Sequence, residues 1–284
     1  RIARSAARLD VKVCVSGVTA LRRLTELGQL RAFSTRPPAF EDVDDVRRDL
    51  QHGQRRQQVS PARRLSAVGE AISSSGFESS NPSAAYGRWA ETYDDDSFEV
   101  LKFDSPVLCA EYAAAHWPPH TDCAVRMLDV GCGTGAVGRL VKEKTDRVEL
   151  HGIDLTPEML SVAERRGDYA SLTEWSASTV PWPFEDNSMD LATCNGVLLY
   201  VDPSRRVFEE FARVVKPNGH AVLMIRDDNL PHWQQHMDDL ERQRRWRLVD
   251  RSGSRNNFPG RHQGEDSRIT YRIYVLRVLS PLTD

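Results

Sequence analysis

Two carboxylates and a run of closely spaced glycines are the residues of this chain with the clearest chemical potential. Residues 126–135 read Arg-Met-Leu-Asp-Val-Gly-Cys-Gly-Thr-Gly, in which apolar strand residues precede a glycine turn. Glycine lets the backbone turn tightly and leaves no side chain between the backbone and a ligand. A helical pattern follows at residues 136–144, with its apolar residues on one face. Strand, turn and helix together predict a nucleotide-type site with free backbone N–H groups at its mouth.

One of the two carboxylates, that of Asp129, lies within the segment 126–135. The other belongs to Asp154, which follows a predicted strand over residues 148–153. It lies 19 positions after Gly135, close to the spacing at which the second strand of a βαβ unit presents an acid to ribose hydroxyls. A carboxylate accepts hydrogen bonds from both hydroxyls of a ribose, and it would repel a phosphate on that sugar. The sequence therefore predicts that Asp154 binds the free ribose of a nucleotide-like ligand.

Two classes of ligand with a free ribose compete for this site: dinucleotides and S-adenosylmethionine. A dinucleotide fingerprint is Gly-x-Gly-x-x-Gly, whereas here the third glycine comes one residue early, although Gly138 lies near. Asp129 stands two residues before the first glycine, where its charge would oppose a pyrophosphate and suit a sulfonium with its α-amino group. The charge of Asp129 therefore favours S-adenosylmethionine as the cofactor.

Four segments in order resemble motifs of the class I S-adenosylmethionine-dependent methyltransferases. Residues 128–135 are similar to motif I, and residues 151–160 are similar to the motif whose acid holds the ribose. Residues 181–191 resemble the segment that leads into the fourth strand, and residues 210–220 resemble the helix and turn before the fifth. The resemblance implies the fold of that superfamily, S-adenosylmethionine as methyl donor, and methyltransferase activity.

Within that superfamily the chain most resembles the methyltransferase-like protein 27 (Williams–Beuren region) family. The shared features are residues 86–94 ahead of the fold, residues 157–160 and residues 165–169. One departure concerns the end of the third strand, where many members of the superfamily carry an acid that contacts the adenine. Ser176 takes that position here. We therefore expect backbone groups to contribute to adenine recognition.

The predicted cofactor site gathers residues at the carboxyl ends of the strands, where open α/β sheets bind their ligands. Its members are Asp129, Gly131, Cys132, Gly133, Gly135, Asp154, Leu155, Met159, Ser176, Ala177 and Asn195, together with Tyr86 and Trp89. The rings of Tyr86, Trp89 and Tyr93 suit a cation–π contact with the sulfonium, and they equally suit a hydrophobic pin for the N-terminal helix. Tyr86, Tyr93 and Asp227 are the candidate catalytic residues, although a general base is needed only for a protonated acceptor.

Strands alternate with helices through the middle of the chain, which predicts a parallel sheet covered on both faces. Two alternating segments, residues 245–251 and 268–279, predict an antiparallel pair joined by a polar loop over residues 252–267. The expected fold is thus an α/β, doubly wound, mostly parallel seven-stranded sheet, Rossmann-like, with an antiparallel C-terminal edge pair. Other expected strands cover residues 126–130, 149–153, 172–176, 189–194 and 220–226, and expected helices cover residues 106–116, 136–145, 157–166 and 203–214.

Length, net charge, hydropathy and cysteine content limit the classes of protein to which the chain can belong. The chain has 284 residues and a net charge of -3, which argues against a general nucleic-acid binder. No apolar run approaches the ~18 residues of a membrane span. The five cysteines have no paired spacing, so reduced thiols are expected. His232 and His236 have the i, i+4 spacing of half a metal site, but no third ligand is evident, so no metal is predicted.

The N-terminal part has a different composition from the rest of the chain. Residues 1–36 hold eight Lys or Arg against two acids, the pattern of an organelle transit peptide. This predicts mitochondrial localisation ahead of plastid, with a cytoplasmic location if the segment is only a disordered tail. Residues 37–82 are polar and predict a disordered linker, and the methyltransferase domain is expected over residues 83–284.

Together these observations predict methyl transfer from S-adenosylmethionine to an oxygen, nitrogen or sulfur of a small molecule. Two alternatives stay open: a non-catalytic S-adenosylmethionine-binding assembly factor of an organelle, and an NAD-type oxidoreductase. The acceptor is not set by the sequence, because acceptor pockets vary while the sheet does not. Four arginines in residues 242–247 suit either an acidic substrate or a solvated charged face.

Overall fold

The alternation of strands and helices predicted from the sequence is present in the computed structural model, which describes residues 82–118, 123–260 and 268–280. The predicted transit peptide over residues 1–36 lies outside the described residues, as does the linker except for its last residue. None of the helices within the described ranges is long and apolar enough to cross a membrane.

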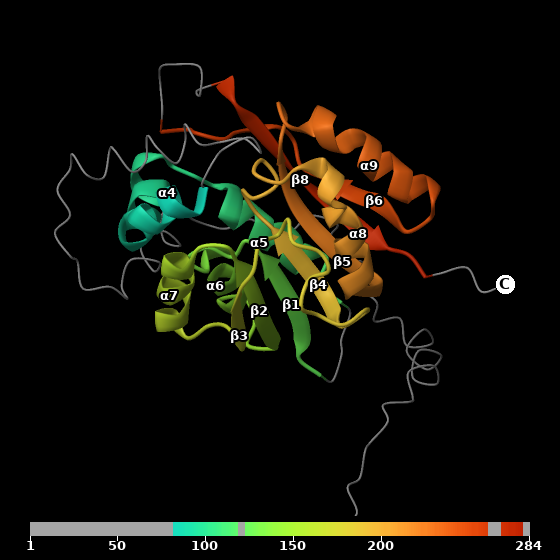
Figure 1. The fold of residues 1–284 in the computed structure, drawn as a ribbon, viewed down its shortest axis with the longest axis horizontal. Helices are drawn as coiled ribbons and strands as arrows, with labels where there is room; N and C mark the ends of the chain where they lie inside the picture. Colours follow the sequence, from blue (N-terminus) through green and yellow to red (C-terminus); the bar gives the residue numbers. More distant parts are fainter. Residues whose placement is uncertain (1–81, 119–122, 261–267, 281–284) are drawn as a thin grey trace, which may run out of the picture. The chain divides into compact units, whose positions relative to one another are not determined.

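A mostly parallel sheet forms the centre of the fold (Figure 1), and its strand order is β3-β2-β1-β4-β5-β8-β6. The parallel strands are β1 (Val125–Val130), β2 (Val148–Asp154), β3 (Ser171–Glu174), β4 (Met189–Cys194) and β5 (Val215–Arg226). The order of the strands reverses between β1 and β4. Such a reversal opens a crevice at the carboxyl ends of the strands, which is where the predicted site residues lie.

The two C-terminal strands pair antiparallel as predicted, but β8 (Thr270–Val278) lies between β5 and β6 (Trp246–Arg251). A two-residue strand, β7 (Arg255–Asn256), pairs with β8 inside the predicted loop and adds an eighth strand to the seven expected. Arg255 and Asn256 are both exposed, so they carry no apolar alternation from which a strand is predicted. The pairing follows from the free edge that β8 offers there.

The described residues form six α-helices, four of which lie in the ranges predicted above. They are α4 (Pro82–Trp89), α5 (Ser105–Ala115), α6 (Ala136–Lys142), α7 (Pro157–Arg166), α8 (Val207–Val214) and α9 (Leu230–Arg242). The helix predicted over residues 203–214 is interrupted at Arg206, whose φ of 59° lies in the left-handed region. The turn expected within residues 210–220 lies inside the range of β5, where Asn218 has a φ of 69° and the pairing with β4 shifts.

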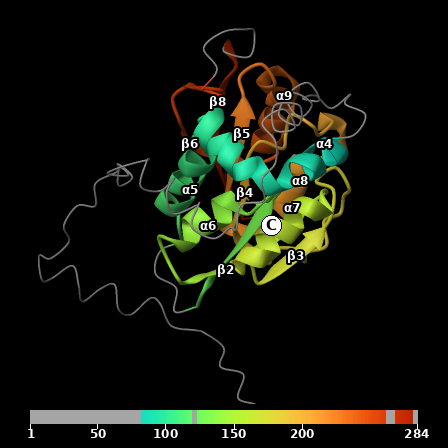
Figure 2. The same ribbon diagram turned by 90° about the vertical axis from the view of Figure 1, so that its left-hand side faces the viewer.

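Alternate residues of the strands feed two hydrophobic cores, one on each face of the sheet. Met127 packs with α5 and α6, whereas its neighbour Leu128 belongs to the core formed with α8 and α9. Figure 2 shows α5 and α6 on one side of the sheet and α8 and α9 on the other. Burial on both faces makes the sheet a rigid support for the loops at its carboxyl edge.

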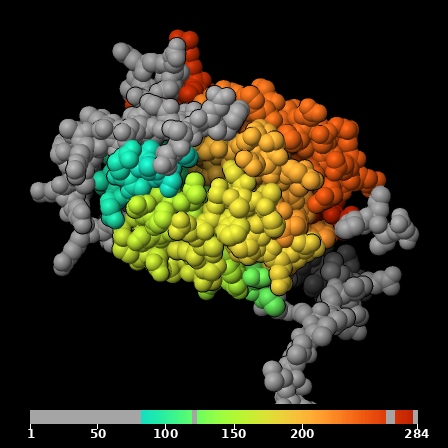
Figure 3. Space-filling view, viewed as in Figure 1, coloured from blue at the N-terminus to red at the C-terminus, as the bar shows by residue number. Residues whose placement is uncertain are grey.

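The N-terminal helix α4 continues through a 3-10 turn (Ala90–Thr92) and a π-helix (Asp95–Val100). This segment lies against α7: Ala90 packs with Met159 and Val162 in one apolar cluster. In the space-filling view the cyan surface of α4 borders the yellow-green surface of α7 (Figure 3). Residues that are far apart in the sequence thus close one side of the crevice.

Candidate active site

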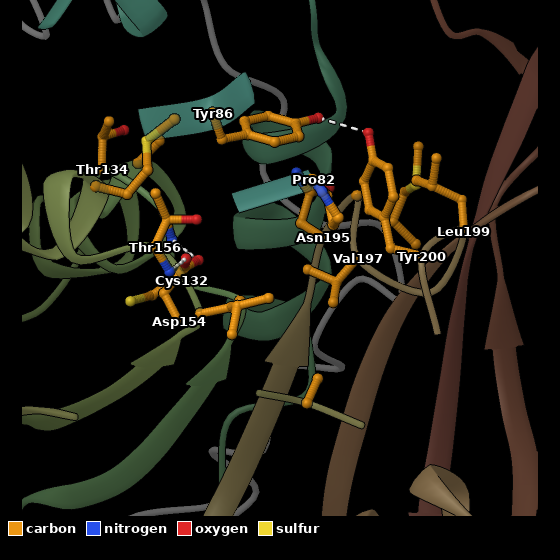
Figure 4. Close-up of a pocket in the computed structure, with 18 of the residues that line it drawn as sticks. Pro82, Tyr86, Cys132, Thr134, Asp154, Thr156, Asn195, Val197, Leu199 and Tyr200 are labelled. Atoms are coloured by element: carbon orange, nitrogen blue, oxygen red, sulfur yellow. Dashed lines mark hydrogen bonds between the residues drawn. The ribbon is translucent and has the colours of Figure 1, made fainter. Parts of the chain in front are cut away.

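A cavity of about 220 Å³ opens at the carboxyl ends of β1, β2, β4 and β5, beside α4 (Figure 4). Its described walls include nearly all the residues predicted to hold the cofactor: Tyr86, Trp89, Asp129, Gly131, Cys132, Gly133, Asp154, Leu155, Met159, Ser176, Ala177 and Asn195. Gly135 is the exception, because it begins α6 behind the turn. Of the candidate catalytic residues, Tyr86 and Tyr93 line the cavity and Asp227 does not.

The glycine turn is required for two different reasons. Gly131 has a φ of +68°, and a Cβ there would lie 2.1 Å from Cγ2 of Val197. Gly133 has a φ of +54° and nothing within 4 Å of the same position. The first glycine lets β1 pass close to the segment after β4, and the second takes a conformation that other residues rarely adopt.

The backbone N–H groups of the glycine turn donate hydrogen bonds to other groups of the protein. The amides of Gly131 and Cys132 both donate to the carbonyl of Ile153, at 2.7 and 3.0 Å. The amide of Gly133 donates to Oδ2 of Asp154 at 2.9 Å. The prediction of free N–H groups at the turn is therefore wrong for these three residues. The reason is that the end of β2 lies directly beside the turn and supplies the acceptors.

Asp154 projects from the end of β2 into the cavity. Its Oδ1 accepts from the amide of Thr156 at 2.8 Å, and its Oδ2 accepts from the amide of Gly133. Burial raises the pKa of this carboxyl, while the two backbone hydrogen bonds act in the opposite direction. Because a carboxylate has about four lone-pair sites, acceptor capacity is left for two ribose hydroxyls.

Asp129 is 1% exposed, and both of its oxygens are engaged. Its Oδ1 accepts from Oγ1 of Thr193 at 2.8 Å, and its Oδ2 accepts from the hydroxyl of Tyr169 at 2.8 Å. Burial raises its pKa from 3.8 to about 6. Asp129 thus lines the cavity and also links β1, β4 and the residues after α7. The sequence indicated the first role and not the second.

Aromatic rings roof the cavity (Figure 4). The hydroxyls of Tyr86 and Tyr200 lie 2.8 Å apart, which joins α4 to the segment after β4. Trp89 is 2% exposed, lies 4.7 Å from the ring of Tyr93, and donates from Nε1 to Asp96 at 2.9 Å. The aromatic residues therefore anchor the N-terminal helix and face the cavity at once. Sequence analysis missed Tyr200, whose only signal is its position a few residues after a strand end.

The comparisons with known proteins agree with this geometry. Residues 128–223 match the sequence model of a methyltransferase domain. Methyltransferase-like protein 27 of Homo sapiens is 31% identical over 146 residues, which are 51% of this chain and 57% of that protein. The demethylmenaquinone methyltransferase of Thermotoga maritima is 34% identical over 99 residues, which are 35% of this chain and 42% of that protein. The chain thus spans about half the length of these curated relatives.

A solved structure shares the fold. The putative methyltransferase in complex with the Haloferax volcanii Trm112 methyltransferase activator superposes with a TM-score of 0.50 at 20% identity, covering 69% of this chain and 98% of that one. Residues 128–223 thus match a methyltransferase domain, and the chain is similar to class I S-adenosylmethionine-dependent methyltransferases in sequence and in fold.

The residues that line the cavity fit S-adenosylmethionine, the cofactor that the fold implies. Asp154 has acceptor capacity for the ribose, and Leu155 and Met159 offer apolar surface beside it. Oδ1 of Asn195 is buried and has no hydrogen-bond partner among the described residues. A buried acceptor without a partner is costly, and the α-amino group of S-adenosylmethionine would supply the missing donor. Ser176 lies beyond the end of β3, and its Oγ accepts from the amide of Ser178 at 3.2 Å.

A largely buried ion pair holds the N-terminal segment against the glycine turn. Asp94 accepts from Oγ1 of Thr134 at 2.7 Å and pairs with the guanidinium of Arg166. Arg166 also donates to the carbonyl of Thr134 at 2.8 Å. Asp94 closes the segment 86–94 that resembled the related family, but its partners are 40 and 72 positions away. Only the fold brings these three residues together.

Asp227 lies outside the cavity lining and has a bridging role. It accepts from Oγ of Ser254 at 2.7 Å, from Oγ1 of Thr270 at 2.6 Å and from Nη1 of Arg272 at 2.7 Å. It thereby connects the end of β5 to β8 and to the loop before it. His232 and His236 both lie on α9, and the described residues contain no group of three metal-ligating side chains.

Proposed function

We propose that this methyltransferase transfers the methyl group of S-adenosylmethionine to a small-molecule acceptor. The observation that carries the proposal is the internal use of the turn amides beside a ribose-binding carboxylate. The amides of Gly131 and Cys132 donate to Ile153, and that of Gly133 donates to Asp154, so the turn does not present a phosphate cradle. A cationic nucleoside without phosphates suits such a site.

The bound cofactor would supply an electrophilic methyl group on a sulfonium. The chain would contribute orientation: Asp154 for the ribose, Asn195 for the α-amino group, and the aromatic roof to exclude water. Methyl transfer is an in-line displacement, so positioning of the two reactants supplies much of the acceleration. The Thermotoga maritima relative is named for a quinone precursor, which supports a small organic acceptor here.

The two alternative functions have less support. An NAD-type oxidoreductase needs N–H groups aimed at a pyrophosphate, and helix α6 behind the turn has only seven residues. A non-catalytic assembly factor does not explain why the cavity continues past the cofactor residues to Arg226 and Phe258. That extra space is what an acceptor requires.

Titration and isotope transfer test the proposal. Calorimetric titration with S-adenosylhomocysteine should show binding, and NAD under the same conditions should show none. Methyl-labelled S-adenosylmethionine should transfer label into a small-molecule extract in the presence of the protein. Tighter binding of NAD, or tight S-adenosylhomocysteine binding without any label transfer, would contradict methyl transfer.

We further propose that residues 1–36 direct the protein to mitochondria, on the basis of their Arg-rich, acid-poor composition. A fusion of residues 1–36 to a fluorescent protein should localise to mitochondria. A matched fusion with its arginines replaced by glutamine should remain cytoplasmic. Plastid or cytoplasmic fluorescence of the first fusion would overturn this proposal.

A further inference from the structure

The cavity extends beyond the residues assigned to the cofactor, into a part that we call the acceptor end. Its described wall is formed by Leu199, Tyr200, Met224, Arg226, Asn257 and Phe258. These residues come from the segment after β4, the carboxyl end of β5 and the loop before β8. Leu199, Met224, Phe258 and the ring of Tyr200 form its apolar part. Phe258 is 5% exposed, and its ring lies 5.4 Å from that of Phe103. The acceptor end therefore suits a molecule with a hydrocarbon or aromatic body.

Among the described residues around the cavity there is no His, Lys or Glu. Burial raises the pKa of each phenol and of the thiol in the lining, so these groups stay protonated at neutral pH: Tyr86, Tyr93, Tyr200 and Cys132. Asp129 and Asp154 lie at the cofactor end, and both oxygens of each already accept hydrogen bonds. The described lining thus offers no base positioned to deprotonate an alcohol, a phenol or an ammonium.

Arg226 is the single cationic residue of the described lining. Its side chain is 11% exposed, and Nε donates to Oδ1 of Asp228 at 2.9 Å while Nη2 bonds the other oxygen. No described residue bonds Nη1. One edge of the guanidinium is therefore fixed by Asp228, and a charged donor is left for the cavity. A guanidinium held in this way is well suited to a carboxylate.

We infer that the acceptor is a carboxylic acid with an apolar body, that Arg226 anchors its carboxylate, and that the product is a methyl ester. This inference rests on the proposed methyl transfer. A carboxylate is a nucleophile that needs no base at neutral pH, which matches a described lining without a base at the acceptor end. An alcohol or a primary amine would need a proton acceptor that the described lining does not supply.

The step balances without any further reactant. One carboxylate oxygen forms a bond to the methyl carbon as the carbon–sulfur bond breaks. The electron pair of that bond stays on sulfur, so the sulfonium becomes a neutral thioether. The carboxylate loses its negative charge as the ester forms, and no proton is moved. Arg226 orients the second carboxylate oxygen through the transfer.

Three probes of equal chain length separate the acceptor classes: decanoate, 1-decanol and decylamine. Each is incubated with the full chain and methyl-labelled S-adenosylmethionine, and half of each product is treated with alkali. We expect label in decanoate alone, and alkali should release it as volatile methanol, because an ester is cleaved and an ether or amine is not. In calorimetry, the protein saturated with S-adenosylhomocysteine should bind decanoate at least tenfold more tightly than decanol.

Two arginine variants show whether the anchor is Arg226. Arg226→Gln should lower decanoate binding at least tenfold and bring it close to that of decanol, while S-adenosylhomocysteine binding changes less than twofold. Arg272→Gln is the matched control, because Arg272 on β8 is paired with Asp227, which follows the neighbouring strand β5, and lies outside the cavity lining. It should retain the wild-type preference. Arg226→Lys keeps the charge and should recover part of the decanoate binding.

Four outcomes would contradict a carboxylate acceptor. The first two are methyl label that survives alkali, and transfer to decanol or decylamine that equals or exceeds transfer to decanoate. The other two are an Arg226→Gln variant that still prefers decanoate over decanol, and failure of all three probes to bind the S-adenosylhomocysteine complex. Alkali-stable label would leave methyl transfer itself standing. Failure of the wild-type protein to bind S-adenosylhomocysteine would instead reject the proposed function, so the two failures are distinguishable.

Discussion

Replacement of Asp154 by asparagine is the sharpest test of the cofactor site. The carboxylate accepts from the amides of Gly133 and Thr156, and it has acceptor capacity left for two ribose hydroxyls. An asparagine keeps the shape but has one acceptor oxygen, and its NH₂ group would face an N–H donor. A hydrogen bond to a charged group contributes about 1.5–3 kcal/mol, so loss of two such bonds to the ribose costs about 3 kcal/mol or more.

That loss corresponds to a rise of about 100-fold or more in the Kd for S-adenosylhomocysteine, since about 1.4 kcal/mol is tenfold. Isothermal titration calorimetry measures the Kd, and a thermal melt of the free protein checks that the domain stays folded. Glu174→Gln is the matched control, because Glu174 is the register partner of Asp154 on β3 and its side chain is exposed. It should leave the Kd unchanged.

Binding of S-adenosylhomocysteine by folded Asp154→Asn protein within threefold of wild type would contradict the assignment of Asp154 to the ribose. In that case the ribose would be held elsewhere, and the spacing between the glycine turn and Asp154 would have no bearing on ligand choice. Equal weakening by Asp154→Asn and Glu174→Gln would also refute it, because a general change in surface charge would then explain the loss.

Three further predictions concern stability. Burial raises the pKa of Asp129 from 3.8 to about 6, so the folded state holds this proton more tightly than the unfolded state. The contribution of Asp129 to stability is therefore present below pH 3.8, and about 3 kcal/mol of it is lost as pH rises through about 6. In urea unfolding at pH 4 and pH 8, the change in stability of wild type and that of Asp129→Asn should differ by about 2–3 kcal/mol, and equal changes would contradict this role of Asp129. Gly131→Ala should lower the free energy of unfolding by more than about 2 kcal/mol, because the new Cβ would meet Val197. Addition of Val197→Ala should recover part of the lost melting temperature, and no recovery would show that the backbone angle alone causes the loss. Asp94→Ala should lower the free energy of unfolding by about 3 kcal/mol or more, because it leaves the 10% exposed Arg166 without its anion. Limited proteolysis should then cut residues 82–100 faster than in wild type, and unchanged cleavage would contradict the anchoring role of Asp94.

Much of the cofactor site was predictable because its signals are local. The strand, the glycine turn and the acid that ends the next strand stand in a short stretch of sequence, and parallel strands bring their carboxyl ends to one edge. Helix α7 begins and ends at the predicted residues, Pro157 and Arg166, since a proline starts it and Gly167 in the left-handed conformation follows it. The sequence alone therefore predicts that Asp154 and Gly133 lie in one crevice.

The hydrogen-bond partners of individual polar groups could not be predicted from the sequence. The carbonyl of Ile153 takes two turn amides, and nothing in the residue types of the turn indicates this. Asp129 was assigned to the ligand from its charge alone, whereas Thr193 and Tyr169 occupy its oxygens. Such partners depend on how closely neighbouring strands and helices approach, which no local pattern encodes.

The amino-acid sequence by itself determined the class of fold, the glycine turn and the identity of the ribose acid, because each is set by backbone preference and short-range spacing. Only the tertiary structure decided which distant groups meet: Tyr86 with Tyr200 over 114 positions, β8 between β5 and β6, and Arg226 at the acceptor end. The physical reason is that long-range contacts follow from the simultaneous burial of many apolar side chains on both faces of the sheet. That packing is a property of the whole chain and not of any one segment.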